Sequence, residues 1–427
     1  MPYSRTSPAR APQFSTRAIR AGRAPEVESG ALTPSICLST TFAQADIGVP
    51  GAHTYARASN PTVATLEAAL GALDDAPPSV CFATGMAATT TLILATAAAG
   101  DEVVVSEVVY GGTARLLERV LAPLGVRATF VDTSDLRAVA AALRSKPKLL
   151  FVETPANPTL RLTDVAAVAD LAREAGVLLA VDNTFLTPLL MRPLDLGADV
   201  ALTSTTKYIE GHNATVGGAI SARDPALLER LRFLRKTIGN IQAPFSAWLT
   251  LRGLDTLPLR LRAHSRHAQQ VAEFLAAHPA VARVHYPGLA TFPQAELARA
   301  QHRDAETGEA LHSGIVSFEL RADLVRDASD GGFAAGVRLA RAVRLATLAE
   351  NLGCTQTLLT HPASMTHADV PQARRHATGI SDGLIRLSVG LEHPRDVIAD
   401  LEQALARVVA GDELEATAAN VEAVARG

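Results

Sequence analysis

The sequence predicts an α/β protein, in which a mostly parallel sheet with helices on both faces is followed by a smaller α+β domain. Two observations carry this prediction. From about residue 61 to 222, short apolar runs alternate with Ala/Leu-rich segments of helical spacing. A long amphipathic stretch then ends the alternation, and new apolar runs follow it. Strands that alternate with helices favour a parallel sheet that is covered on both faces.

The elements are expected in the following order. Residues 1–60 are rich in Pro, Ser and Arg and are expected to form an irregular arm. The main domain spans 61–256, and a segment such as LTDVAAVADLAREAG (162–176) has the spacing of a helix. The expected strands of this domain are VCFAT (80–84), EVVVS (102–106), ATFVD (128–132), LLFVE (149–153), LLAVD (178–182), VALTS (200–204) and GGAIS (217–221).

The second domain spans 257–427. It is expected to begin with one long helix over LPLRLRAHSRHAQQVAEFLAAHP (257–279). Apolar strands follow at VARVHYP (281–287) and GIVSFEL (314–320), and further helices are expected up to the C-terminus. A chain of 427 residues has room for such a division, because domains have roughly 150 residues each.

Composition and charge exclude several classes of protein. The 40 basic and 43 acidic side chains give a net charge of −3, so no cationic excess exists to bind nucleic acid. No apolar run reaches the ~18 residues of a membrane span, and the first 20 residues lack the apolar core of a secretory signal. The cysteines, Cys37, Cys81 and Cys354, are far apart and form no CxxC pair. We therefore expect a cytoplasmic enzyme.

Two histidines of the second domain were considered as metal ligands. His361 and His367 are six residues apart, whereas ligands on one helical face are three or four apart. No carboxylate cluster accompanies them. We expect no metal site.

Lysine is scarce in this chain, which carries 36 Arg and only four Lys. Lys146, Lys148 and Lys236 stand in polar segments that are typical of solvated charge. Lys207 follows the apolar run VALTS and three consecutive hydroxyl residues. Such surroundings desolvate an amine and lower its pKa, as a Schiff-base lysine requires.

Other polar groups follow the remaining strands of the main domain. Parallel sheets bind ligands beyond the carboxyl ends of their strands, so these positions are candidates for a site. Gly85 and Met86 open a helical run, where free N–H groups suit a phosphate. Tyr110 follows the second strand, and Asp182 ends a buried strand, where a carboxylate needs a partner.

Together these residues meet the requirements of a pyridoxal phosphate site, although each alone is ambiguous. The chain has no GxGxxG or Walker-type sequence that would indicate a nucleotide. The cofactor needs an amine for its aldehyde, a carboxylate for its ring nitrogen, donors for its phosphate and an aromatic ring for its face. Lys207 is the candidate amine, Asp182 the carboxylate and Tyr110 the aromatic ring. The candidate phosphate donors are Gly85, Met86, Ser204 and Thr206.

At these residues the chain resembles the transsulfuration (Cys/Met metabolism) enzymes of the aspartate-aminotransferase fold type, which is fold type I of the pyridoxal phosphate enzymes. The resemblance extends from FSTRAIRAG (14–22) to about Arg407. Its most specific stretches are YARASNPT (55–62), FATGMAA (82–88), YGGT (110–113), ETPANPT (153–159), VDNTF (181–185), STTKYIEGH (204–212), LRGLDTL (251–257), HPASMTH (361–367) and GISDGLIRLSVGLE (379–392).

The resemblance implies a role for each of several residues around the cofactor. Lys207 would bind it covalently and move protons between Cα, Cβ and Cγ of the substrate. Tyr110 would stack on the ring and assist proton transfer. Asn157 would bond the phenolic oxygen of the ring, and Asp182 its nitrogen.

The resemblance also implies contacts with a neighbouring subunit and with the substrate. Tyr55 and Arg57 would reach the phosphate in the neighbouring subunit, which makes a homodimer the minimum active unit and a homotetramer the expected state. Tyr55 would thereby belong to the catalytic set. Arg386 would clamp the α-carboxylate of the amino-acid substrate with its planar fork.

The implied reaction is elimination or replacement at Cγ of a sulfur amino acid, as in cystathionine γ-lyases and γ-synthases, with cystathionine or an O-acylhomoserine as substrate. Glu350 matches the glutamate that reads the distal end of the substrate in these enzymes, and Asn351 beside it would also contact the substrate. Gly112 stands where methionine γ-lyases have a cysteine.

Four positions depart from the cystathionine enzymes: Thr54, Thr203, Ala214 and Asn351. Asn351 replaces a usual serine and Ala214 a usual aspartate, and both resemble O-acetylhomoserine sulfhydrylases. That activity, or methionine γ-lyase activity, is therefore the alternative. A non-catalytic binding module on the same fold is a more remote one.

Overall fold

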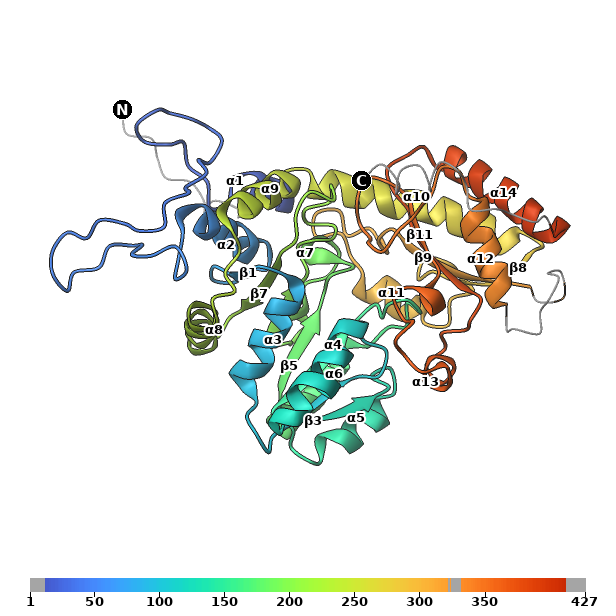
Figure 1. Ribbon diagram of the computed structural model, residues 1–427, viewed down its shortest axis with the longest axis horizontal. Coiled ribbons are helices and arrows are strands. Elements are labelled where there is room, and N and C mark those ends of the chain that lie inside the picture. Colours follow the sequence, from blue (N-terminus) through green and yellow to red (C-terminus); the bar gives the residue numbers. More distant parts are fainter. Residues whose placement is uncertain (1–11, 322, 324–331, 412–427) are drawn as a thin grey trace, which may run out of the picture.

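A computed structural model describes residues 12–321, 323 and 332–411 of the chain (Figure 1). The beginning of the expected arm, residues 1–11, lies outside this part, as does the last stretch of the second domain, residues 412–427. Within the described part, no helix is both long and apolar enough to cross a membrane.

Seven strands of the described chain form a large sheet. Their bounds are β1 (Val80–Phe82), β2 (Glu102–Ser106), β3 (Arg127–Val131), β4 (Leu149–Glu153), β5 (Leu178–Asp182), β6 (Val200–Thr203) and β7 (Gly218–Ala222). They are ordered β1-β7-β6-β5-β4-β2-β3. Strand β7 is antiparallel to both of its neighbours, and the other pairs are parallel. The prediction of a mostly parallel sheet is confirmed.

Helices cover both faces of the large sheet. Those before residue 257 are α1 (Phe14–Arg20), α2 (Pro61–Leu73), α3 (Gly85–Thr96), α4 (Gly111–Arg115), α5 (Leu136–Leu143), α6 (Val165–Ala175), α7 (Thr187–Leu190), α8 (Pro225–Ile238) and α9 (Pro244–Leu254). Short turns of other helix types are η1 (Leu116–Leu121), η2 (Ala122–Leu124) and η3 (Pro193–Leu196).

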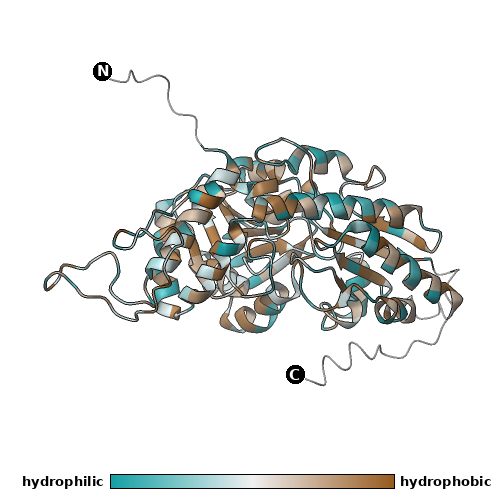
Figure 2. Ribbon diagram, turned by 90° about the horizontal axis from the view of Figure 1, so that it is seen from above, coloured by the Kyte–Doolittle hydropathy of each residue, from teal (hydrophilic) through white to brown (hydrophobic). Residues whose placement is uncertain are grey.

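The inner positions of the central strands are apolar because both faces of the sheet are buried there. On β2, Val103 and Val105 lie in the core that includes residues of α3 and α8, while Val104 lies in the opposite core with residues of α2 and α6. Successive side chains of a strand point to opposite faces, so a sheet covered twice requires a continuous apolar run. Figure 2 shows this hydrophobic interior and the mixed character of the helices around it.

Five strands of the described chain form a smaller sheet after α10. It is ordered β10-β11-β12-β9-β8. The elements are α10 (Leu257–Ala277), β8 (Val281–His285), α11 (Ala295–Gln301), β9 (Ile315–Leu320), α12 (Phe333–Ala342), β10 (Thr347–Leu348), β11 (Leu358–Thr360), η6 (Pro362–Ser364), α13 (Gln372–Ala377), β12 (Leu384–Ser388) and α14 (Pro394–Ala410).

Helix α10 joins the two parts of the molecule. Its first turns place Leu257 and Leu261 in the core of the large sheet. Its later turns place Val271 and Leu275 in the core of the small sheet. The helix therefore fixes the two sheets relative to each other, and the division that we propose at residue 256 coincides with its start.

The arm departs from its prediction in one segment. Residues 14–20 form α1, whereas an irregular conformation was expected for all of 1–60. Phe14 and Ala18 are buried in the core with α2, and this tertiary contact stabilises a helix too short to form alone. The rest of the arm extends from the body as loops (Figure 1), and Val27 and Ile47 are 96% and 98% exposed.

Candidate active site

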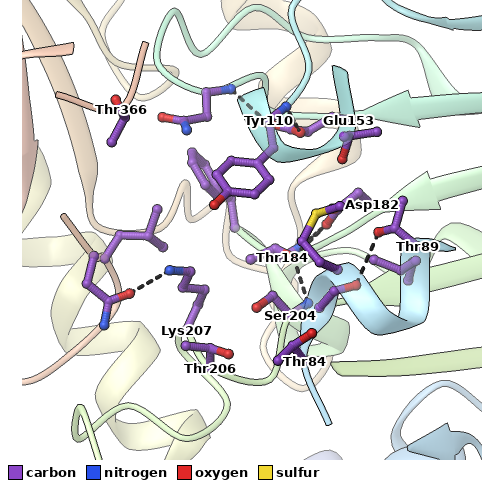
Figure 3. Close-up of a pocket in the computed structure, with 18 of the residues that line it drawn as sticks. Thr84, Thr89, Tyr110, Glu153, Asp182, Thr184, Ser204, Thr206, Lys207 and Thr366 are labelled. Carbon is purple, nitrogen blue, oxygen red and sulfur yellow. Dashed lines mark hydrogen bonds between the residues drawn. The ribbon is translucent and has the colours of Figure 1, made fainter. Parts of the chain in front are cut away.

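A cavity of about 290 Å³ lies at the carboxyl ends of the large-sheet strands. Its walls come from the segments after β4, β5 and β6, from the start of α3, and from residues 350–352, 366 and 386 near the small sheet. Figure 3 shows Lys207, Tyr110 and Asp182 around this space. All the predicted site residues except Tyr55 and Arg57 line it.

Lys207 enters the cavity from the turn that follows β6. Its Nζ donates a hydrogen bond to Asn351 Oδ1 at 2.6 Å. Burial, followed by the nearby charge of Arg386, lowers the pKa of Lys207 to about 8. The three other lysines are exposed. Lys207 is thus the lysine whose free amine is available near neutral pH.

Asp182 lies at the end of β5, in the wall of the cavity. Its Oδ1 accepts hydrogen bonds from the N–H and the hydroxyl of Thr184, at 3.0 and 2.5 Å. Among the described residues, none donates to Oδ2. Burial raises the pKa of Asp182 to about 6, so this carboxylate is suited to bind a cationic N–H group that would hold it ionised.

The start of α3 provides a cradle for an anion. Gly85 and Met86 are the first residues of the helix, so their N–H groups have no intrahelical acceptor. A Cβ on Gly85 would lie 2.9 Å from Cβ and Oγ of Ser204, so only glycine allows this close approach. Thr206 also lines the cavity, but its hydroxyl already bonds to the N–H and C=O of Gly217.

Tyr110 and Asn157 lie on the opposite wall. The N–H of Tyr110 donates to Glu153 Oε2 at 2.7 Å, and its ring borders the cavity. The N–H of Asn157 donates to Glu153 Oε1 at 3.1 Å. The Oδ1 atom of Asn157 accepts from Arg386 Nη1 at 2.9 Å.

Arg386 is 2% exposed, on β12. Besides Asn157, it donates to the C=O of Asn351 at 2.9 Å and to Thr360 Oγ1 at 3.0 Å. Its Nε has no hydrogen-bond partner, and no carboxylate of the described residues forms an ion pair with it. Burial lowers its pKa to about 10. A buried cation with an unsatisfied donor is a binding site for an anion.

Glu350 and Asn351 complete the cavity on the side of the small sheet. Glu350 is exposed at the rim. Asn351 Nδ2 donates to Asn213 Oδ1 at 2.6 Å, so Asn351 connects Lys207 to the loop after β6. Across the cavity, a Cβ on Gly112 would lie 2.5 Å from the ring of Tyr110, so a side chain there would displace this ring.

Tyr55 and Arg57 are not part of the cavity of their own chain. Arg57 Nη1 donates to the C=O of Lys236, and its guanidinium lies 5.5 Å from the centroid of the Tyr55 ring. Both residues stand on the arm. Their expected role in a neighbouring subunit stays a prediction.

Sequence reasoning missed Glu153, which lines the cavity beside Asp182. Its signal was present, because LLFVE ends on an acidic residue just as LLAVD does. It also missed several hydroxyl residues of the wall, namely Thr84, Thr89, Thr113, Thr184 and Thr366. The two histidines considered as ligands are engaged elsewhere: His361 bonds to Ser364 Oγ and to the C=O of Asp382, and His367 bonds to Thr366 Oγ1.

The residues present fit pyridoxal phosphate. An amine with lowered pKa, a carboxylate with a free oxygen and a glycine-lined helix start all face one cavity. Comparison with known proteins decides the family. The model of the family described as "Cys/Met metabolism PLP-dependent enzyme" matches residues 15–406. The chain belongs to this family.

Relatives in the Cys/Met metabolism family have several named activities. The chain is 42% identical to the cystathionine β-lyase of Coxiella burnetii, over 91% of this chain and 97% of the relative. It is 44% identical to the cystathionine γ-synthase of Mycobacterium bovis, over 91% and 96%. It is 40% identical to the cystathionine γ-lyase of Bacillus subtilis, over 92% and 99%.

A solved structure supports the same assignment to the Cys/Met metabolism family. The cystathionine γ-synthase of Xanthomonas oryzae pv. oryzae, in complex with aminoacrylate and cysteine, superposes with a TM-score of 0.86. It is 41% identical and covers 95% of this chain and 100% of its own. The expected fold class is confirmed, and the protein is an enzyme that uses pyridoxal phosphate.

The lowered pKa of Lys207 predicts how this Cys/Met metabolism enzyme takes up its cofactor. Only the free amine attacks an aldehyde, so the rate of pyridoxal phosphate uptake by the apoenzyme should rise with pH around a midpoint near 8. The visible absorbance that appears on binding measures this rate. A rate that keeps rising above pH ~10, as for an unperturbed lysine, would contradict the assignment.

Proposed function

We propose that the enzyme catalyses elimination or replacement at Cγ of a sulfur amino acid, with cystathionine or an O-acylhomoserine as substrate. The observation that carries the proposal is Arg386, which is buried in the same cavity as Lys207 and has an unsatisfied Nε. An amino-acid α-carboxylate would satisfy it and would place Cα beside the amine. The names of the relatives support the choice of substrate.

Four residues of the cavity have separate roles in the proposed reaction. When bound, pyridoxal phosphate supplies an electron sink that acidifies the Cα proton. Arg386 orients the substrate through its α-carboxylate. Lys207 removes the Cα proton and carries protons at Cβ and Cγ, and Asn351 offers its amine a hydrogen-bond acceptor 2.6 Å away. Glu350, at the rim of the cavity, is placed to contact the distal amino group of a long substrate.

The two alternative activities, O-acetylhomoserine sulfhydrylase and methionine γ-lyase, are each opposed by a residue of the site. Asn351 and Ala214 match O-acetylhomoserine sulfhydrylases, but Glu350 at the rim favours a substrate or product with a cationic distal amino group, as in cystathionine. Gly112 leaves no thiol at the position expected for methionine γ-lyases, and a side chain there would displace Tyr110. We therefore keep cystathionine or O-succinylhomoserine as the first choice of substrate.

A substrate panel tests this choice. The purified enzyme is given cystathionine, O-succinylhomoserine with cysteine, O-acetylhomoserine with sulfide, and methionine, and the products are identified by mass spectrometry. We expect either cysteine, 2-oxobutanoate and ammonia from cystathionine, or cystathionine from O-succinylhomoserine. Homocysteine and pyruvate from cystathionine would instead show cleavage at Cβ. Silence on both preferred substrates would overturn the proposal.

We also propose that the active unit is at least a homodimer, that the full assembly is a homotetramer, and that the enzyme is cytoplasmic. Exposed apolar side chains on the arm, such as Val27, Leu32 and Ile47, support an interface there, because water is a poor solvent for them. Free cysteines at all three positions, Cys37, Cys81 and Cys354, accord with a reducing compartment.

A complementation experiment tests whether Arg57 serves the neighbouring subunit. Lys207→Ala and Arg57→Ala proteins should each be nearly inactive, but a mixed dimer contains one site with both defects and one intact site. Unfolding and refolding an equal mixture should restore about a quarter of wild-type activity, since half of the dimers are mixed. No recovery, with dimers present by light scattering, would show that Arg57 acts within its own subunit.

A further inference from the structure

Glu153 has no part in the roles assigned so far, yet it lines the cavity beside Asp182. It is the last residue of β4, and it is 7% exposed. Its two carboxyl oxygens accept from two different segments: Oε2 from the N–H of Tyr110 and Oε1 from the N–H of Asn157. Its own N–H donates to Ser106 Oγ at 3.2 Å, at the end of β2.

The two segments held by Glu153 have separate origins. Tyr110 precedes α4 and follows β2, whereas Asn157 stands in the turn after β4. The ring of Tyr110 and the amide of Asn157 both border the cavity. A single carboxyl group therefore holds both residues. Tyr110 is expected to cover one face of the cofactor ring, and Asn157 is expected to bond the phenolic oxygen of that ring.

The surroundings of Glu153 act on its pKa in opposite directions. Burial and the charge of Asp182, its register partner on β5, raise the pKa of Glu153 to about 8. The two N–H donors oppose this shift. Two carboxylates side by side resist a double charge, which adds to the effect of burial on Glu153.

We propose that Glu153 is a positioning residue of the cofactor site, which fixes Tyr110 and Asn157 relative to each other through its two oxygens. The role concerns the bound cofactor, which the family shows, and does not depend on the substrate proposed above. Removing the carboxyl group leaves two buried N–H groups without partners and releases both segments. The ring of Tyr110 and the amide of Asn157 are then no longer held in a fixed position relative to each other.

Two variants of the holoenzyme test this role. Glu153→Ala removes both acceptors, and Glu153→Gln keeps one, because its amide nitrogen cannot accept from an N–H. A matched control is Glu102→Gln, at the opposite end of β2, where the carboxylate accepts from Thr129 Oγ1 at 2.6 Å. Circular dichroism of the visible cofactor band reports the asymmetry around the ring, and it is recorded without substrate.

We expect a graded loss across these variants. The visible circular dichroism per bound cofactor should fall in Glu153→Gln and further in Glu153→Ala. With the most active substrate of the panel, kcat should fall about 10-fold and about 100-fold in the same order, because misplaced groups reduce the rate of the chemical step. The KM should change by less than about threefold, since Arg386 still binds the carboxylate.

Two results would overturn the role of Glu153. One is a Glu153→Ala enzyme whose cofactor circular dichroism and kcat match those of Glu102→Gln. The other is a lower midpoint of thermal unfolding with an unchanged cofactor band, which would make Glu153 a residue of stability alone. If Glu153→Ala gives no folded protein, the same comparison is decided by Glu153→Gln. Inactivity on every substrate would leave the spectroscopic result intact and would count against the proposed function only.

Discussion

Replacing Lys207 with alanine is expected to abolish covalent attachment of the cofactor and to reduce turnover by roughly 10³-fold or more. The reason is that Lys207 is both the amine whose burial lowers its pKa and the base that contacts the substrate in the proposed reaction. The wild-type enzyme should be yellow and should be bleached irreversibly by borohydride. The Lys207→Ala enzyme should retain no label after borohydride treatment and denaturation, as measured by intact-protein mass spectrometry.

Lys236→Ala is the matched control for this experiment. Lys236 is exposed near the end of α8, so its loss should leave both the colour and the turnover unchanged. Attachment of the cofactor in Lys207→Ala would contradict the assignment. A colourless wild-type protein, even when supplied with pyridoxal phosphate, would favour a binding module over an enzyme.

Replacing Arg386 with alanine is expected to reduce kcat/KM roughly 100-fold, which corresponds to about 2.7 kcal/mol. Most of the loss should appear as a higher KM, because in the proposed role the buried guanidinium binds the α-carboxylate before any bond is broken. Arg386→Lys keeps the charge but loses the planar fork, so it should recover only part of the activity. Steady-state kinetics on the best substrate of the panel measures both effects.

A substrate analogue makes the test of Arg386 specific. The α-carboxamide of the substrate lacks the charge that Arg386 would bind. Wild type should strongly prefer the acid, whereas Arg386→Ala should treat acid and amide nearly alike. Arg375→Ala is the control, because Arg375 already pairs with Asp382 and its loss should lower the midpoint of thermal unfolding without removing this preference. Equal preference for the acid in wild type and Arg386→Ala would exclude the clamp.

Most of the large sheet could be predicted from the sequence for a simple physical reason. A strand buried on both faces needs apolar side chains at its successive inner positions, and β2, β4 and β5 match their predicted runs residue for residue. The same reasoning predicts that Asp182, which ends β5, and Lys207, which follows β6 after three hydroxyl residues, lie near each other, and both line one cavity. Arg386 and Glu350 came instead from the resemblance. Arg386 lies within the five-residue strand β12 and Glu350 follows the two-residue strand β10, and such short strands do not mark a site.

The elements that were missed depend on contacts that are distant in the sequence. Strands β10 and β11 have two and three residues, too few to show a period. Helix α1 is stabilised by the burial of Phe14 against the body of the molecule rather than by its own seven residues. The acidic end of LLFVE marks Glu153 as a candidate, but its contact with Tyr110 forms only when β2 and β4 are adjacent, so its role is not visible in the sequence.

The residues that line the cavity differ in how freely they can be substituted. The residues proposed to hold the cofactor mostly follow strands of the large sheet, whereas of those proposed to contact the substrate, Glu350 follows β10 and Arg386 lies on β12 of the small sheet. Substitution of Glu350 at the rim should therefore shift substrate preference while the cofactor stays bound. A duplicated gene could acquire a new activity through a few such substitutions. Asn351 and Arg386 are less free to vary, since their bonds to Lys207 and Asn157 cross from one wall to the other. For directed evolution of new substrates, Glu350 is the position to randomise first.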